Sequence, residues 1–245
     1  WSSITEHHRE IGFENDFISV AEVEREKLGK HPWSIGGGGA SELKELLEER
    51  AGKRLNDLVE SIGISSFTLE DDVYMAPRHA HLTRGLRAAD LRWMIEGDII
   101  RDWATADAAS VVFPYDSAFK PHLTTTQHHY LWPFKTNIAS NILFGGKTKV
   151  QGGLRWFEFG RLTASKLLTP LSITYGEVAT HNHFVLDRGG KVFKQTAPII
   201  KLKDGATEDE HLALLGYLNS STACFWMKQV FYPKATSTGD VSIEK

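Results

Sequence analysis

Two histidines separated by one residue, His181 and His183, have the spacing in this sequence that best suits metal chemistry. Because side chains two residues apart on a strand point to the same face, the two imidazoles could bind one divalent cation there. A carboxylate ligand would have to come from another part of the chain. The pair therefore keeps a divalent-metal nuclease open as an alternative function, although no metal site is predicted.

Other residues with catalytic potential lack the surroundings that the chemistry requires. The run Glu70-Asp71-Asp72 could collect a cation, but such a run is typical of a solvated turn. Cys224 lies between Ala223 and Phe225 on a helix that we expect to be buried, where a thiol is inert. No Gly-x-Ser-x-Gly nucleophile elbow occurs. The sequence predicts no catalytic residue in this chain.

Four consecutive glycines, Gly36 to Gly39, stand directly before a stretch that is typical of a helix. Glycines ahead of a helix can present backbone N–H groups to a phosphate. However, Ala40 and Ser41 follow the glycines in place of the Lys and Ser or Thr of a nucleotide loop, and Pro32 argues against a preceding strand. We predict a flexible connector, with a DNA phosphate at the Ser41 helix start as the alternative.

Charge is divided unevenly along the chain. The basic segment, residues 117–203, holds twelve Lys or Arg against three acidic residues, a net charge of +9, while the remainder carries −12. Aromatic residues are interleaved with the positive charges: Trp132, Phe134, Trp156, Phe157 and Phe159. This combination is typical of a nucleic-acid surface, and a solvated face with aromatic residues in the core is the alternative.

The composition indicates a soluble globular protein. The chain has 245 residues, of which 41% are hydrophobic, and can bury a real core. It contains no apolar run of membrane-spanning length, and its polar start is unlike a secretory signal. One cysteine excludes an internal disulfide and fits a reducing cytoplasm. Because the chain has no initiator Met, we expect it to be part of a longer polypeptide.

Helix signals concentrate at the two ends of the chain. A capping box from Ser19 to Glu22 predicts a helix that stops at Gly29, and Ser41 begins a second helix that ends near Gly52, with Leu43, Leu46 and Leu47 on its apolar face. A second capping box, from Thr207 to Glu210, predicts a helix that buries Leu212, Leu215 and Leu218. Ser220 caps the next helix, over 222–231.

Strand signals fill the middle of the chain. Short β-rich runs predict strands at 58–62, 64–69, 73–75, 93–95, 110–113, 171–175, 184–186 and 197–202. Arg188-Gly189-Gly190 predicts a tight hairpin turn. We therefore expect an α+β fold with a mixed, mostly antiparallel β sheet flanked by helices. Residues 1–54 form a helical connector and residues 55–245 the second domain.

Four stretches together resemble a known family. They are Glu96–Trp103 with Phe113–Asp116, Gly153–Leu162, Ala179–Gly190, and Leu215–Ser221. In this order they resemble the C-terminal target-recognition region of type IIG (Eco57I-like) adenine-specific DNA methyltransferases, and most of all the PglX-like enzymes of BREX phage-exclusion systems. The resemblance runs from about Trp33 to Lys234. It implies that residues 55–245 are a DNA specificity domain acting in phage defence.

The resemblance also implies what lies outside this chain. Such enzymes bind S-adenosylmethionine on a glycine-containing loop and hold the flipped adenine with an (Asn/Asp)-Pro-Pro-(Tyr/Phe) tetrapeptide, and this sequence has no Pro-Pro pair. The methylase domain, with its S-adenosylmethionine, is therefore expected elsewhere in a parent enzyme, and this chain itself is expected to be non-catalytic and without cofactor. Double-stranded DNA is the expected partner, and other phage-defence proteins are further candidates.

The basic segment supplies the residues that we expect to face DNA: Lys135, Asn137, Lys147, Lys149, Arg155 and Arg161. Lysines would contact phosphates, whereas Arg and Asn can make bidentate contacts with guanine and adenine. Arg101 is a further candidate for a phosphate, although it could instead pair with Asp98 or Asp102. The signatures around Gly97 and Asn219 are interpreted as mainly structural, Asn219 and Ser220 satisfying backbone groups at a helix junction.

Two other classes of function remain open from the sequence. One is the divalent-metal nuclease that would use His181, His183 and an acidic partner. The other is a protein-interaction module that docks components of a defence complex through its acidic N-terminal third. Salt-dependent DNA binding without metal and without cleavage would distinguish a recognition domain from both.

Overall fold

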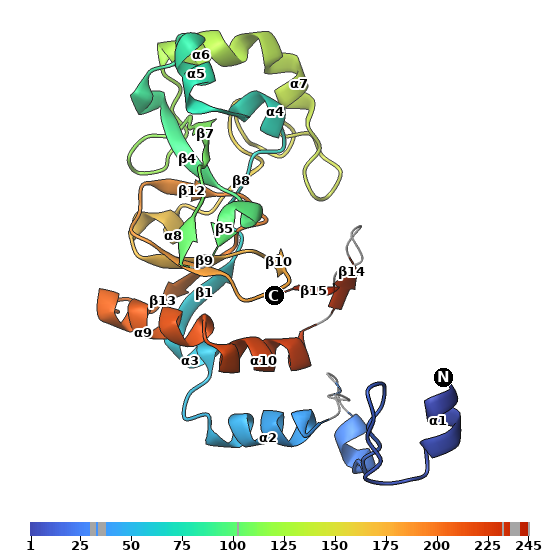
Figure 1. The fold of residues 1–245 in the computed structure, drawn as a ribbon. Coiled ribbons are helices and arrows are strands. Elements are labelled where there is room, and N and C mark those ends of the chain that lie inside the picture. Colours follow the sequence, from blue (N-terminus) through green and yellow to red (C-terminus); the bar gives the residue numbers. More distant parts are fainter. Residues whose placement is uncertain (30–32, 34–37, 102, 232, 236–240, 245) are drawn as a thin grey trace.

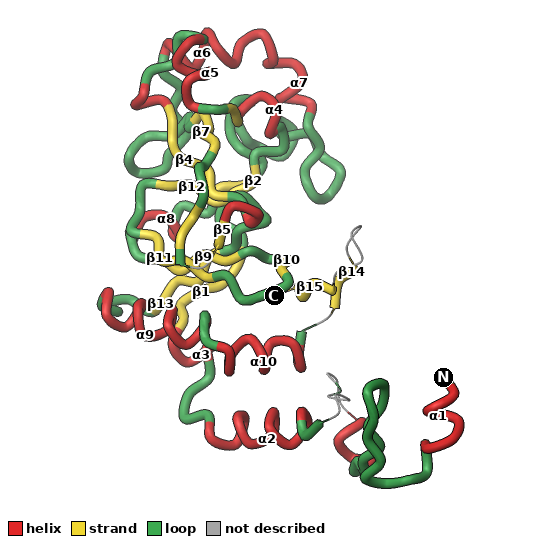
Figure 2. The backbone as a smooth tube through the Cα atoms, viewed as in Figure 1, coloured by secondary structure: helices red, strands yellow, loops and turns green. Residues whose placement is uncertain are grey.

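The computed structural model describes residues 1–29, 33, 38–101, 103–231, 233–235 and 241–244. Its strands form several small, mostly antiparallel sheets with helices around them (Figures 1 and 2). The predicted α+β class is confirmed. Within the described ranges, no helix has the length and apolar character needed to cross a membrane.

One half of the main body is built on a four-stranded antiparallel sheet. Its strands lie in the order β1 (Val59–Gly63), β13 (Ile199–Leu202), β9 (Ser172–Tyr175) and β11 (Phe184–Asp187). Helices α9 (Glu208–Leu218) and α10 (Ser221–Val230) pack on it, and the shared core includes Ile173, Ile200, Leu215, Leu218 and Met227. This sheet uses four of the predicted strands.

The helix starts predicted beside this sheet are correct. Thr207 Oγ1 accepts from Glu210 N at 3.2 Å and Glu210 Oε2 accepts from Thr207 N at 2.7 Å, so the capping box is formed. Ser220 Oγ accepts from Ala223 N at 3.1 Å and caps α10. One predicted core position is wrong, because Leu212 is 43% exposed and His211 takes the buried place instead.

The other half is built on a mixed sheet in the order β12 (Lys191–Phe193), β4 (Leu91–Ile95), β7 (Ala109–Val112) and β3 (Met75–Ala76). Strand β12 pairs with β4 in parallel, and the other pairs are antiparallel. At this end of the molecule lie α4 (Asp71–Tyr74), α5 (Arg78–Thr83), α6 (Thr125–Leu131) and α7 (Lys135–Ser140) (Figure 1). Their core, the upper core, includes Tyr74, Met94, Val111, Leu131, Ile138 and Phe159.

The predicted hairpin at Arg188-Gly189-Gly190 is wrong. Strand β11 pairs with β9 and strand β12 pairs with β4, so the two strands on either side of the turn belong to different sheets. Gly189 and Gly190 do have positive φ, +94° and +81°, but they redirect the chain from one sheet to the other. A third core links the halves there, through Ile95, Ile100, Val185, Phe193, Ala197 and Ile199.

The remaining elements are short. The other strands are β2 (Ser66–Phe67) paired with β8 (Arg161–Leu162), β5 (Ile100–Arg101) paired with β6 (Ala104–Thr105), and β10 (Val178–Ala179), β15 (Val241–Glu244) and β14 (Pro233–Ala235) in one sheet. The other helices are α1 (Ser2–His7), α2 (Ala40–Arg50), α3 (Leu55–Leu58), α8 (Ser165–Leu168) and the 3-10 turns η1 (Arg25–Gly29), η2 (Ala88–Asp90), η3 (Gly97–Ile99) and η4 (Trp132–Phe134).

The N-terminal helix predictions need correction. After Ser19 only η1 forms, because Val20 is engaged in a turn ladder in which its N–H donates to Phe13 O at 2.8 Å. Helix α2 ends as predicted but begins at Ala40, so Ser41 lies inside its first turn and gives no cap bond. Its leucines are not buried, and the helix instead lies against α10, where Trp226 Nε1 donates to Glu48 Oε1 at 3.1 Å.

Two predicted strands are shorter or replaced. The run 64–69 contains only β2, and the run 73–75 overlaps α4, which leaves only Met75 in β3. The acidic run that we expected to be a turn begins this helix, with Asp71 and Asp72 in its first turn. Carboxylates at that position are favoured by the positive end of the helix dipole, which outweighs the β propensity of the following residues.

Close backbone contact explains one signature glycine. Gly97 N donates to Thr196 Oγ1 at 3.1 Å, and a Cβ on Gly97 would lie 2.2 Å from the carbonyl oxygen of Thr196. That oxygen belongs to the backbone beside the third core and cannot swing away as a side chain could. Gly216, in the other signature, is helical in α9 with nothing within 4 Å of its added Cβ.

We therefore predict opposite effects for two glycine substitutions. Gly97→Ala should destabilise the chain by about 1–3 kcal/mol, the cost of overpacking. Gly216→Ala should leave stability unchanged or raise it by roughly 0.5–1 kcal/mol, because alanine is the better helix former. Urea unfolding of both variants measures the difference, and equal stabilities would contradict this assignment of Gly97.

Asp90 fixes the start of α6 against the mixed sheet. Its buried carboxylate accepts from Arg87 N at 2.8 Å, Thr124 Oγ1 at 2.8 Å and Thr126 Oγ1 at 2.6 Å. Thr124 is also the N-cap of α6. Burial alone would raise the pKa of Asp90, but the hydrogen bonds from Arg87 and the two threonines outweigh it and hold the pKa well below its usual range.

This depressed pKa predicts a stability contribution that acid removes. The contribution is complete above about pH 4, the unfolded value of an aspartate, and is lost as the pH falls toward the folded pKa. Asp90→Asn should cost roughly 2 kcal/mol near neutral pH, since hydrogen bonds to a charged group are lost. Urea unfolding between neutral and acid pH should show that the difference in free energy of unfolding between the variant and the unmodified chain becomes smaller below about pH 4. Asp204→Asn, at an exposed position, is the matched control. A difference in free energy of unfolding that stays constant with pH would contradict the stabilising role of the Asp90 carboxylate.

Candidate nucleic-acid interface

The structure divides the basic segment into two parts. In its C-terminal part, residues 188–203, every Lys and Arg side chain has a protein partner. Lys194 Nζ lies 2.9 Å from Asp71 Oδ2 and 2.8 Å from Glu96 Oε2, and Arg188 pairs with Glu208 at 2.6 Å. Further cations of this part also have protein partners: Lys191 with Asp187, Lys201 with the carbonyls of Thr169 and Leu171, and Lys203 with the carbonyl of Asp57. These charges hold strands and turns together.

The first part is different in composition and exposure. Residues 117–157, the carboxylate-free stretch, contain five Lys or Arg and no Asp or Glu. Lys120, Lys147 and Arg155 are exposed and Lys135 is half-buried. Among the described residues, no carboxylate lies within salt-bridge distance of these four. Uncompensated positive charge on the surface therefore concentrates here, around α6, α7 and the loop that follows them (Figure 1).

Helices α6 and α7 present both charge and aromatic rings. Leu131 and Ile138, seven residues apart, are fully buried and hold one face of the helical segment in the upper core. Trp132 is consequently turned outward and is 51% exposed. The Lys135 ammonium lies 4.4 Å from the centre of the Trp132 ring and 5.9 Å from that of Trp156. A cation held near one exposed and one half-buried indole ring can contact both the phosphates and the bases of a nucleic acid.

Lys149 does not take the place that the sequence suggested. Its side chain is 0% exposed, and its Nζ has no hydrogen-bond partner among the described residues and lies 5.7 Å from the centre of the Tyr74 ring. A turn in which Gly152 N donates to Thr148 O at 2.8 Å rotates the side chain inward. Burial lowers the pKa of Lys149 to about 8, against the opposing charges of Glu70 and Glu158. In this structure Lys149 cannot reach a duplex.

The other predicted contacts lie at several places. Asn137 is exposed on α7, and Lys147 is exposed in the loop that follows α7. Arg155 is exposed, with its Nη1 donating to Pro121 O at 3.2 Å. Arg161 is exposed on β8. Arg101 is remote from α7, since its strand β5 packs against β11; its Nη1 donates to Ile100 O at 2.7 Å, and Asp102 lies outside the described residues.

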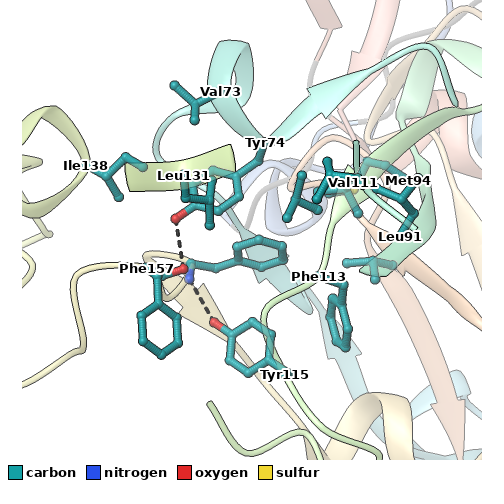
Figure 3. Packing of buried hydrophobic residues seen from close by; sticks show 14 residues of the cluster. Val73, Tyr74, Leu91, Met94, Val111, Phe113, Tyr115, Leu131, Ile138 and Phe157 are labelled. Atoms are coloured by element: carbon teal, nitrogen blue, oxygen red, sulfur yellow. Dashed lines mark hydrogen bonds between the residues drawn. The ribbon is translucent and has the colours of Figure 1, made fainter. Parts of the chain in front are cut away.

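The upper core supports this surface through hydrogen bonds of two buried tyrosines. Tyr74 Oη donates to Phe157 O at 2.8 Å, and Phe159 N donates to Tyr115 Oη at 2.7 Å (Figure 3). Phe157 and Phe159 are therefore buried in the core, whereas Trp132 and Phe134 are exposed. The alternative that the sequence left open, aromatic residues in the core, holds for Phe157 and Phe159.

One exposed aromatic residue was missed from the sequence. Phe144 is 99% exposed and lies in the loop between α7 and Arg155, next to two glycines. The signal was available, because Phe144-Gly145-Gly146-Lys147 places a large apolar residue at a turn, where polar residues are usual.

The histidine pair lacks the geometry of a metal site. His181 and His183 lie in the loop between β10 and β11 and not on a strand, with ring centres 6.3 Å apart. Asn182 between them donates from Nδ2 to Leu218 O at 2.6 Å and to Ser220 O at 3.0 Å. Throughout the described part of the chain, no three His, Cys, Asp or Glu side chains are grouped so that they could hold a metal ion.

The signature around Asn219 has a structural role, and the glycine run is described only in part. Asn219 binds the backbone of Phe184 on both sides, with Oδ1 accepting from its N–H at 3.0 Å and Nδ2 donating to its carbonyl at 2.9 Å. The Asn219 side chain thus satisfies backbone hydrogen-bonding groups of strand β11 and not, as we had expected, those of the helix junction. At the glycine run, Gly38 and Gly39 have φ of +65° and +76° before α2, and Gly36 and Gly37 lie outside the described residues.

Comparison with known proteins agrees with the resemblance seen in the sequence. No family model matches the chain. A solved structure of the type IIL restriction-modification enzyme MmeI in complex with DNA is similar to 73% of this chain and 23% of that one, with 13% identity and a TM-score of 0.49. The adenine-specific methyltransferase PglX of Streptomyces coelicolor is 36% identical over 238 residues, which are 96% of this chain and 20% of that protein. The chain is therefore homologous to one part, about a fifth of the length, of the adenine-specific methyltransferase PglX.

Proposed function

We propose that this chain is the DNA target-recognition region of a PglX-like adenine-N6 methyltransferase that acts in phage defence. The observation that carries the proposal is the carboxylate-free stretch, which combines exposed cations with the Lys135 ammonium held over the exposed Trp132 ring. Homology to part of an adenine-specific methyltransferase supports it independently. The region binds the duplex, and a separate domain that uses S-adenosylmethionine methylates the adenine.

This division of labour follows from the chemistry of adenine methylation. The N6 amino group is reached only after the base leaves the stack, at a cost of a few kcal/mol. Phosphate contacts from Lys135, Lys147 and Arg155 hold the duplex while the base is out. Asn137 is exposed on α7, two residues after Lys135, and has the bidentate amide that suits adenine. Arg161 and Arg101 are further contacts in this proposal, and Lys149 is not among them.

The remaining assignments rest on the same proposal. Residues 55–245 form the recognition domain, and residues 1–54 connect it to the methylase domain of the parent enzyme. The sequence contains no Pro-Pro pair, so the adenine-holding tetrapeptide of such enzymes has no counterpart here, and we assign no step of methyl transfer to this chain. It acts in the cytoplasm, on double-stranded DNA, and other defence proteins are its candidate protein partners.

A binding measurement tests the proposal directly. Four or five phosphate contacts should give a slope of about −4 in a plot of log binding constant against log salt concentration. We expect fluorescence anisotropy with a labelled duplex to show this slope equally in magnesium and in a chelator, without cleavage. Binding that is independent of salt would contradict the proposal, and chelator-sensitive cleavage would favour the metal nuclease.

Two lysines that are neighbours in sequence provide a matched pair of variants. Lys147→Met removes an exposed cation and should weaken binding severalfold while reducing the salt slope by about 0.9. Lys149→Met replaces a buried cation by an apolar side chain of similar length, so it should leave the slope unchanged and stability equal or higher. The same anisotropy titrations and thermal unfolding measure both. If Lys149→Met lowers the slope as much as Lys147→Met does, the assignment of the two lysines is wrong.

A further inference from the structure

Phe144 lies at the tip of an ordered hairpin. In the 141–150 hairpin, Lys149 N donates to Asn141 O at 2.8 Å, Leu143 N donates to Lys147 O at 2.8 Å, and Ile142 pairs with Thr148. Phe144 follows Leu143 directly and is 99% exposed. An exposed aromatic ring forgoes the roughly 1.5–3 kcal/mol that burial of such a side chain provides. Single exposed apolar residues are common on protein surfaces, so the geometry and charge around this ring decide what it can contact.

The tip is narrow. Gly145 and Gly146 close the hairpin with φ of +104° and +81°, and nothing lies within 4 Å of a Cβ added to either. Gly146 N donates back to Leu143 O at 3.0 Å, which completes a tight turn. The ring thus projects from a thin two-stranded ribbon with open space around the turn. Its dimensions suit entry into a confined space and not coverage of a broad flat surface.

The base of the hairpin is anchored in the upper core. Asn141 Nδ2 donates to Glu70 Oε2 at 2.9 Å and to Leu69 O at 3.3 Å. Lys149 is buried over Tyr74, and Leu143 packs on Gly152, where an added Cβ would lie 2.5 Å from its Cδ1. The base of the hairpin is therefore held in a fixed position. A side chain at its tip keeps its place when it contacts a partner, which a side chain on a flexible loop would not do.

The charge around the tip identifies the kind of partner. Lys147 is exposed three residues from Phe144, and the whole carboxylate-free stretch to which both belong has no acidic residue. An apolar ring beside an exposed cation complements a polyanion whose interior is apolar and stacked. Double-stranded DNA has both properties, with phosphates outside and base pairs within.

We propose that Phe144 is an intercalating wedge that enters the DNA stack and opens one base step. Apolar side chains that enter between base pairs unstack them and kink the duplex, at a cost of a few kcal/mol per step that added protein contacts offset. Opening a step beside the target lowers the cost of extruding an adenine. This inference rests on the proposed function, since it assumes that the carboxylate-free stretch holds the duplex.

Binding to a duplex whose stack is already weakened tests the wedge. We compare a fully paired duplex with one that has a central mismatch, at the same length and salt concentration. The unmodified chain should bind the mismatched duplex about tenfold more tightly, because roughly 1.4 kcal/mol of the unstacking cost is then already met. Phe144→Ala should reduce this ratio to about one while the salt slope stays unchanged, and Phe144→Leu should retain most of it.

Controls separate the wedge from the function on which it rests. Phe17→Ala removes another exposed phenylalanine, 84% exposed outside the basic segment, and should leave the ratio unaltered. Thermal unfolding should not change in Phe144→Ala, since the ring has no core contacts to lose. If salt-dependent binding persists but Phe144→Ala keeps the mismatch preference, or the unmodified chain has none, the wedge is overturned and the proposed function stands. If the chain shows no salt-dependent DNA binding, both are overturned.

Discussion

Two buried tyrosine hydroxyls hold the segment on which the whole candidate interface depends. Tyr74 donates to the carbonyl of Phe157, and Tyr115 accepts from the N–H of Phe159 (Figure 3). Residues 141–160 contain no helix, and their strand pairing is limited to a bridge between Ile142 and Thr148, so their path also depends on where their ends are fixed. Ile138 in the upper core fixes one end and the tyrosine bonds fix the other. Burial raises the pKa of both hydroxyls, so they stay neutral across the physiological range.

Charge counting along the chain could find the basic segment but not which of its cations are exposed. The basic segment contains cations of two kinds that look identical in sequence. Lys194 lies between two carboxylates, Asp71 and Glu96, that are about a hundred residues away in the chain, and only the fold brings them together. Lys149 is buried because one turn rotates it, although Lys147 two residues earlier is exposed. Such differences depend on tertiary contacts, and a pattern of residue types cannot express them.

Local signals predicted local structure well, and long-range pairing poorly. The capping boxes at Thr207 and Thr124 depend on residues three apart, and the former was predicted from sequence and is formed. Strands with strongly β-rich composition, such as β4 and β9, were found within one or two residues. The turn at Gly189 shows the limit, since its positive φ was correct while the strands beside it join different sheets. Turn chemistry specifies a reversal of the chain but not the partner of the next strand.

An irregular surface segment that is fixed at both ends has a particular advantage for recognition. Because its backbone is already ordered by Tyr74, Tyr115 and Asn141, the proposed binding of a duplex would require little further loss of conformational entropy. Its outward positions, among them Phe144 and Lys147, have few contacts with the core that holds the segment. Substitutions at those positions can therefore change what the surface binds without changing the fold. Physical separation of support from contact allows one scaffold to carry different specificities.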